Sequence, residues 1–128
     1  MSLPIESLAV ILPRYGKSLG GGAETLTKSL VEQIAPHSAR GRALKRIEIW
    51  TTCAIDHRTW ENHFDSGVTI EDGMAVRRFP VDPRDLERFV HAELAMRDGR
   101  SLALDEQLDW MANSVNSAAL YAHIARYG

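Results

Sequence analysis

The chain has 128 residues, a formal net charge of −2 and a sequence pI near 6.2, with 45% apolar and 25% charged residues. This size suits one domain with a modest core, and the balanced charge gives no indication of binding to nucleic acid or anionic lipid. Cys53 is the only cysteine. An internal disulfide and a four-cysteine zinc site are therefore excluded, and a reducing, cytoplasmic environment is expected. We expect neither a signal peptide nor a transmembrane segment, because the longest apolar run, 8–12, is far too short.

The first half of the chain is typical of a βαβ unit. The apolar, β-branched run 8–12 predicts a buried parallel strand, and a glycine-rich loop follows it over 14–22. Residues 23–35 predict an amphipathic helix, which Pro36 is expected to end. Residues 47–52 predict a second strand. Such a unit is almost always a right-handed crossover within a parallel sheet.

The periodicity of this helix predicts which side packs on the sheet. Its apolar face is expected to consist of Leu26, Leu30 and Ile34, at i, i+4 and i+8. Glu24 and Lys28 are spaced to pair on the opposite side, and Glu24 suits the first turn because it interacts favourably with the helix dipole.

A β-hairpin is predicted in the middle of the chain. Residues 68–70 and 74–79 alternate as strands, and Asp72-Gly73 supplies the turn between them. Arg77 and Arg78 are neighbours on the second strand, so one is expected to point inward and the other into solvent.

Three helices are predicted after the hairpin. Asp82-Pro83 is a strong helix start, with Asp82 as N-cap, and Asp98-Gly99 ends that helix. Ser117 is expected to cap the last helix. The apolar face of the first helix is expected to consist of Leu86, Phe89, Val90 and Leu94. In the second helix the apolar residues are expected to be core: Leu104, Leu108, Trp110 and Met111.

These elements predict an α/β fold, a Rossmann-like, partial doubly wound parallel sheet in a single partial domain over 1–128. In a doubly wound sheet the first strand has neighbours on both sides. The residues after the hairpin predict no further strand that could pair with the second side of the strand over 8–12. An exposed sheet edge is therefore expected there. Exposed edges recruit partners, and a homodimer through this edge is therefore predicted.

The glycine loop is the first candidate site. Gly20, Gly21 and Gly22 lie between a strand and a helix N-terminus, where free amides and the helix dipole attract phosphate. Lys17 is a candidate for the same phosphate contact, and exposure to solvent alone is the alternative role. Gly16-Lys17-Ser18 does not belong to a Walker loop, because the required upstream glycine is Ile11. The Gly-x-Gly-x-x-Gly dinucleotide fingerprint is also absent.

A short-chain dehydrogenase is the alternative enzyme class. Gly16, Gly20 and Gly22 resemble the glycine pattern of such enzymes. However, Ala125 stands four residues after Tyr121, where those enzymes have their catalytic lysine, and the glycines begin late after the strand. A fragment of an NAD(P)-dependent dehydrogenase and a non-enzymatic α/β binding module both remain as alternatives.

The order of several motifs resembles family 4 glycosyltransferases of the two-domain, double-Rossmann fold. A strand, a proline and a variable loop lead to Gly-Gly-Ala-Glu at 21–24. Thr-Thr-Cys-Ala at 51–54 with Asp56, the stretch 72–80, and a Trp…Ser…Leu series ending at Leu120 fit a bacterial branch. Ser114-Val115 and Ala118 depart from the last motif, which has Gly-Pro and Pro at these positions.

The resemblance implies the N-terminal, acceptor-side part of a hexosyltransferase of the retaining type, which moves a sugar from a nucleotide sugar to a hydroxyl acceptor, saccharide or lipid-linked. The nucleotide sugar is a co-substrate, and no tightly bound cofactor is expected. In that family the catalytic groups lie mostly in a C-terminal donor domain. They would lie beyond residue 128, so the isolated chain is expected to be inactive. The parent enzyme is expected in the cytoplasm, peripheral to the membrane.

The second candidate site follows the second strand. Asp56, His57 and Arg58 come at the carboxyl edge of the sheet, where α/β proteins bind ligands, and they are candidate acceptor contacts. No metal site is expected, because the spacing of His57 and His63 fits no metal motif. Cys53 has no activating partner nearby in sequence and is expected to be buried and inert.

Overall fold

The computed structural model describes residues 6–16, 19, 21–39 and 46–127. In this part of the chain four strands and four helices form: β1 (Ser7–Ile11), α1 (Gly22–Ala39), β2 (Arg46–Thr52), β3 (Gly67–Glu71), β4 (Met74–Phe79), α2 (Leu86–Arg97), α3 (Leu104–Ala112) and α4 (Ala118–Tyr127). None of these described helices has the length and apolarity that a membrane crossing needs.

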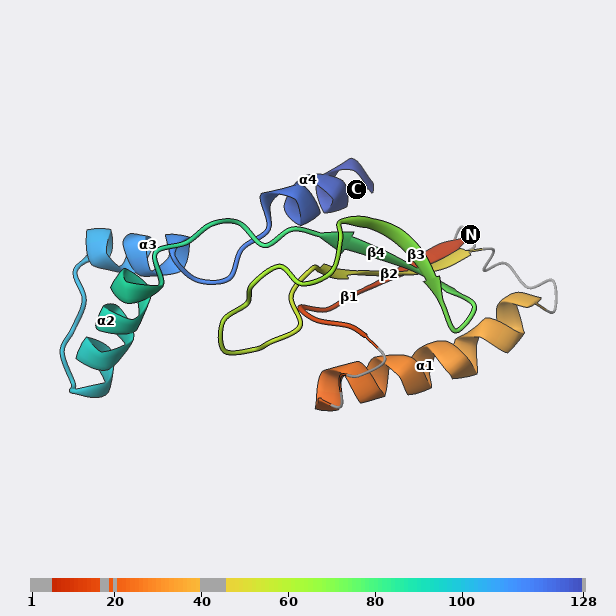
Figure 1. Cartoon of the computed structure of the whole chain (residues 1–128), viewed down its shortest axis with the longest axis horizontal. Helices are drawn as coiled ribbons and strands as arrows, with labels where there is room; N and C mark the ends of the chain where they lie inside the picture. Colours follow the sequence, from red (N-terminus) through yellow and green to blue (C-terminus); the bar gives the residue numbers. More distant parts are fainter. Residues whose placement is uncertain (1–5, 17–18, 20, 40–45, 128) are drawn as a thin grey trace, which may run out of the picture.

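The strands form one open sheet in the order β1-β2-β4-β3. β1, β2 and β4 are parallel, and β3 pairs antiparallel with β4. Helix α1 lies along one face and α4 on the other, whereas α2 and α3 stand together beyond the end of the sheet (Figure 1). The predicted α/β class, the parallel β1–β2 pair and the hairpin are therefore confirmed. Asp72 and Gly73 both have positive φ, 51° and 78°, as a tight hairpin turn requires.

The main core lies between α1 and the sheet. Its buried members come from the loop after β1 and from α1, β2 and β4: Leu12, Tyr15, Val31, Ile47, Ile49, Met74 and Val76, with Val10 and Ile34 packed against them. The predicted helix face was correct for Ile34 and wrong for its other two members, because Leu26 is 69% exposed and Leu30 is also exposed. Glu24, Thr27 and Val31 are buried instead. Thr27 tolerates burial because its hydroxyl donates to the Ala23 carbonyl at 2.8 Å.

Helix α1 also continues beyond Pro36 to Ala39, so the predicted end at residue 35 was wrong. A proline inside a helix has no N–H to donate to the carbonyl four residues earlier, here that of Glu32, so the helix loses one ladder hydrogen bond. The preference of the preceding residue for extended backbone is only a bias.

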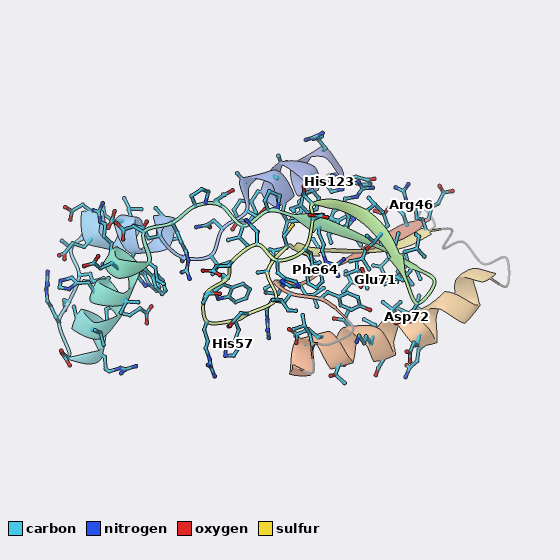
Figure 2. The ribbon with its side chains drawn as sticks, in the orientation of Figure 1. Arg46, His57, Phe64, Glu71, Asp72 and His123 are labelled. Carbon is cyan, nitrogen blue, oxygen red and sulfur yellow. The ribbon has the colours of Figure 1, made fainter. Side chains whose placement is uncertain are left out.

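The second core lies between α4 and the opposite face of the sheet. His123 stacks edge-on against Trp50, with ring centroids 4.4 Å apart, and also contacts Phe79 and Tyr127 at 5.1 Å. Figure 2 shows His123 on the side of α4 that faces the sheet. Its Nε2 is buried without a hydrogen-bond partner. Burial lowers the pKa of His123 below its ordinary value near 6.5, and the cations Arg77 and Arg126 lower it further.

This lowered pKa predicts acid sensitivity. Because the unfolded chain binds a proton more readily than the folded one, the contribution of His123 is fully present above about pH 6.5 and is lost as the pH falls through the folded pKa. We expect His123→Phe to flatten the decline in the free energy of unfolding between pH 7 and pH 5, as measured by urea denaturation. His57→Gln, at an exposed histidine, should leave the decline unchanged. An unaltered slope in His123→Phe would contradict this assignment.

Helices α2 and α3 form a separate pair. Phe89 stacks on Trp110 with ring centroids 6.3 Å apart, and Trp110 Nε1 donates to Glu93 at 2.7 Å. The predicted core role of Leu104, Leu108 and Met111 was wrong, because all three are more than half exposed. The pair stands away from the sheet (Figure 1). Among the described elements each of these helices packs mainly on the other, which leaves part of both apolar faces exposed.

The predicted start of α2 was also wrong. Asp85 is the N-cap, and its carboxylate accepts from the Arg88 amide at 3.1 Å. Asp82 instead accepts from the Ala118 amide at 2.8 Å and so binds the first turn of α4. Ser117, as predicted, accepts from the Leu120 amide at 3.3 Å. Asp82 thus accepts a hydrogen bond from a helix that begins 36 residues further along the chain. Local sequence alone could not predict this partner.

Candidate functional site

The candidate site lies at the carboxyl edge of the parallel strands, where the loops after β1 and β2 meet. Thr52 Oγ1 donates to the Pro13 carbonyl at 2.6 Å, and Arg14 Nη1 donates to the Ile55 carbonyl at 2.8 Å. The Arg14 guanidinium also lies 5.9 Å from the ring centre of Trp60. These contacts fasten the start of the glycine loop to the end of β2 and to the loop that carries Asp56.

Arg78 is the buried anchor beneath these loops. Its guanidinium bonds Glu71 at 2.5 Å, donates to the Tyr15 carbonyl at 2.9 Å and lies 4.1 Å from the ring centre of Phe64. The side chain is 3% exposed, whereas that of Arg77 is 32% exposed and faces Glu48 at 3.6 Å. The prediction that one of the two arginines points inward is confirmed, whereas the predicted solvent exposure of the other is only partial, because the Nε of Arg77 is buried. Figure 2 shows Phe64 and Glu71 between the sheet and α1.

The N-terminus of α1 carries an internal ion pair. Glu24 bonds Arg14 at 3.1 Å, and its carboxylate occupies the space that a Cβ on Gly21 would need. The predicted pairing of Glu24 with Lys28 is replaced by this one, and Lys28 Nζ donates to the Gly16 carbonyl at 3.3 Å. Arg14 was missed from the sequence, because nothing local marks a residue ten positions before its partner.

Gly22 is the first residue of α1 and is exposed to solvent. A Cβ built on it would meet nothing within 4 Å. The first hydrogen bond of the helix runs from the Thr25 amide to the Gly21 carbonyl at 3.0 Å, so the preceding amides of the first turn have no intrahelical partner. An anion can therefore approach this terminus closely. The other two predicted residues of the loop, Lys17 and Gly20, lie outside the described residues.

Asp56, His57 and Arg58 are all exposed on the loop after β2. Asp56 accepts from the Arg58 amide at 2.7 Å, and this bond holds the pKa of Asp56 below its ordinary value. Figure 2 shows His57 pointing away from the sheet at the rim of the loop. Asp56 is therefore an ionised hydrogen-bond acceptor at neutral pH and a weak base.

Two further groups near this edge, Cys53 and Tyr15, have environments that disfavour their ionised forms. Cys53 is buried, as predicted, and burial raises the pKa of its thiol, so the reactive thiolate is disfavoured. Burial likewise raises the pKa of Tyr15. Among the residues that the structure describes, no three His, Cys, Asp or Glu side chains converge in a way that would hold a metal ion.

Comparison with known proteins returns no relative for this chain. No protein-family model matches it, and neither a curated protein nor a solved structure does. The inference about function therefore rests on the residues themselves and on the place the fold gives them.

Proposed function

We propose that this chain is the acceptor-side, Rossmann-like part of a glycosyltransferase that moves a sugar from a nucleotide sugar to a hydroxyl acceptor. The observation that carries the proposal is the open N-terminus of α1 at Gly22, next to the neutralised Arg14–Glu24 pair, at the carboxyl edge of three parallel strands. Ligands of open α/β sheets bind at this edge. The order of motifs that resembles family 4 glycosyltransferases supports the same assignment.

The first role of this chain is to contact the donor diphosphate. Free amides at a helix N-terminus stabilise phosphate charge, and a side chain at Gly22 would occupy the approach. Glu24 would repel an anion if its charge were unpaired. Arg14 cancels that charge at 3.1 Å, so the terminus keeps its attraction for a phosphate group.

The second role is to hold the acceptor. Retaining glycosyl transfer needs the acceptor hydroxyl group placed on the same face of the sugar carbon as the leaving diphosphate, and positioning alone contributes several kcal/mol to such reactions. Asp56 accepts a hydrogen bond in its ionised form, and its lowered pKa suits orientation of a hydroxyl group better than removal of its proton. Arg58 adds a donor fork for hydroxyl or phosphate groups of a saccharide or lipid-linked acceptor.

The remaining chemistry belongs, in this proposal, to a second domain that binds the nucleotide sugar and stabilises the leaving diphosphate. The sheet of this chain would then be the partial, doubly wound sheet of the first domain, with β1 at its edge. The parent enzyme would work in the cytoplasm, at the membrane surface where its acceptor is lipid-linked.

Titration of this chain with uridine diphosphate tests the phosphate role. We expect saturable shifts of the Gly22 and Ala23 amide signals in NMR spectra, with affinity on the order of millimolar because few contacts are available. Gly22→Val should weaken this binding about tenfold or more by blocking approach to the helix end. Ser29→Val, which places the same side chain at an exposed position further along α1, should leave the affinity unchanged.

The alternatives predict different results. Amide-signal shifts that NAD produces and uridine diphosphate does not would support the dehydrogenase hypothesis. No shift with either nucleotide, in a chain whose spectrum shows it folded, would overturn the proposed phosphate contact. Equal weakening in Gly22→Val and Ser29→Val would show that binding does not use the helix terminus.

A further inference from the structure

Among the described strands, β1 lies at the edge of the sheet, with one side that pairs with no other strand. Within the described part of the chain it pairs with β2 alone. The Leu12 amide donates to the Trp50 carbonyl and the Arg46 amide donates to the Glu6 carbonyl, each at 3.2 Å. Even-numbered residues of this segment therefore direct their backbone groups toward β2. Because backbone direction alternates along a strand, the N–H and C=O groups of Ser7, Ala9 and Ile11 point away from the sheet.

The outward N–H and C=O groups of β1 can pair with the same groups of a second copy. In an antiparallel pair centred on Ala9, each outward N–H meets an outward C=O of the second strand: Ala9 opposite Ala9, and Ser7 opposite Ile11 in both directions. Such a pair has the two-fold symmetry that a dimer of identical chains requires. The register is bounded by Pro13, which has no N–H to extend the ladder.

The side chains on the α4 face fit the same register. Ser7, Ala9 and Ile11 lie opposite Arg46, Glu48 and Trp50 of β2, the face on which α4 packs. A hollow of about 360 Å³ opens beside Ser7 and Ala9, walled by Trp50 and Tyr127. Ile11 is 47% exposed. In the antiparallel pair the Ile11 of one copy lies beside Ser7 of the other, at the mouth of this hollow.

We propose that β1 is a homodimer interface, in which two copies pair antiparallel about Ala9 and each Ile11 enters the hollow beside the other copy's Ser7. The two sheets become one continuous sheet, and the unused backbone groups of both edges are satisfied. Five paired residues and one apolar side chain, Ile11, from each copy make a small protein interface. The dimer is therefore expected to be weak and concentration-dependent.

Cysteine cross-linking tests the register. Opposed residues in a hydrogen-bonded antiparallel pair have Cα atoms about 5.5 Å apart, within disulfide reach. Ala9→Cys should therefore form a covalent dimer under mild oxidation. Ser7→Cys alone and Ile11→Cys alone should remain monomeric on non-reducing gels, whereas an equimolar mixture of these two should cross-link. Buried Cys53 stays in every variant and in the unmodified chain, which serves as the background.

Each other pattern counts against the proposal. Self-linking of Ser7→Cys would indicate a parallel, in-register pair, and no cross-linking in any variant would exclude the edge contact. Light scattering gives an independent reading without cysteines. The unmodified chain should approach twice its 14.3 kDa mass as concentration rises, and Ile11→Lys should stay near one copy. A mass of one copy for both proteins at high concentration would overturn the dimer.

Discussion

Arg78→Ala is expected to lower the free energy of unfolding by about 3–5 kcal/mol, the range for removing one partner of a buried ion pair. Arg78 is buried and joins three segments: Glu71 on the hairpin at 2.5 Å, the Tyr15 carbonyl at 2.9 Å and the ring of Phe64. Removing it leaves the Tyr15 carbonyl without this donor and takes away the cation beside Glu71, whose side chain is 19% exposed. Urea denaturation at pH 7 measures the loss.

A second arginine gives the control. Arg88 pairs with Asp109 at 3.0 Å on the α2–α3 surface, where its side chain is 63% exposed. Exposed pairs of this kind contribute about 0–1 kcal/mol, so Arg88→Ala should change the unfolding midpoint little. Equal effects of Arg78→Ala and Arg88→Ala would contradict the anchoring role of Arg78.

Ile49→Ala is expected to lower the free energy of unfolding by about 2–5 kcal/mol, the usual range for this change in a core. Ile49 lies at the centre of β2 with 0% exposure and belongs to the cluster between the sheet and α1. The substitution removes buried apolar surface and leaves a cavity that the flanking strands close only in part. Thermal and urea denaturation of the variant measure the effect.

Leu26→Ala provides the contrasting case. Leucine at this position fits the helical periodicity, yet it is 69% exposed on α1. Surface changes usually stay within about 0.5 kcal/mol. A loss for Leu26→Ala comparable to that for Ile49→Ala would mean that α1 packs with the face that the periodicity predicts.

Local patterns were sufficient for the strands and the hairpin. The apolar runs that form β1 and β2 and the Asp72-Gly73 turn are each determined by a few adjacent residues, so sequence alone located them. Asp98 likewise ends α2 as its C-cap. Alternation of side chains on β4 was also enough to predict that one of two neighbouring arginines is buried.

The features that local patterns did not predict depend on contacts between residues far apart in the sequence. The rotation of α1 follows from Arg14, which draws Glu24 inward, and from Thr27, which satisfies its own hydroxyl group. Asp82 was taken for the cap of α2 because it precedes a proline, but it bonds α4 instead. Each of these depends on where a distant segment lies, which periodicity does not encode.

The candidate site was predicted in its residue types and only partly in its geometry. Asp56, His57 and Arg58 do lie on the loop after β2, at the carboxyl edge. The link between this loop and the glycine loop is Arg14, through the Ile55 carbonyl 41 residues away. No sequence motif predicts that contact, although it holds the glycine loop and the loop after β2 together at the carboxyl edge of the sheet.

Sugar transfer by the protein that the complete gene encodes is the most direct test of the proposed function. The protein is incubated with radiolabelled nucleotide sugars and a set of saccharide and lipid-linked acceptors, and labelled product and released nucleoside diphosphate are both measured. We expect acceptor-dependent release of the diphosphate, strongly reduced by Gly22→Val and unchanged by Ser29→Val. If the pure, folded protein transfers no sugar from any nucleotide donor, or oxidises a substrate with NAD(P) instead, the glycosyltransferase assignment is wrong.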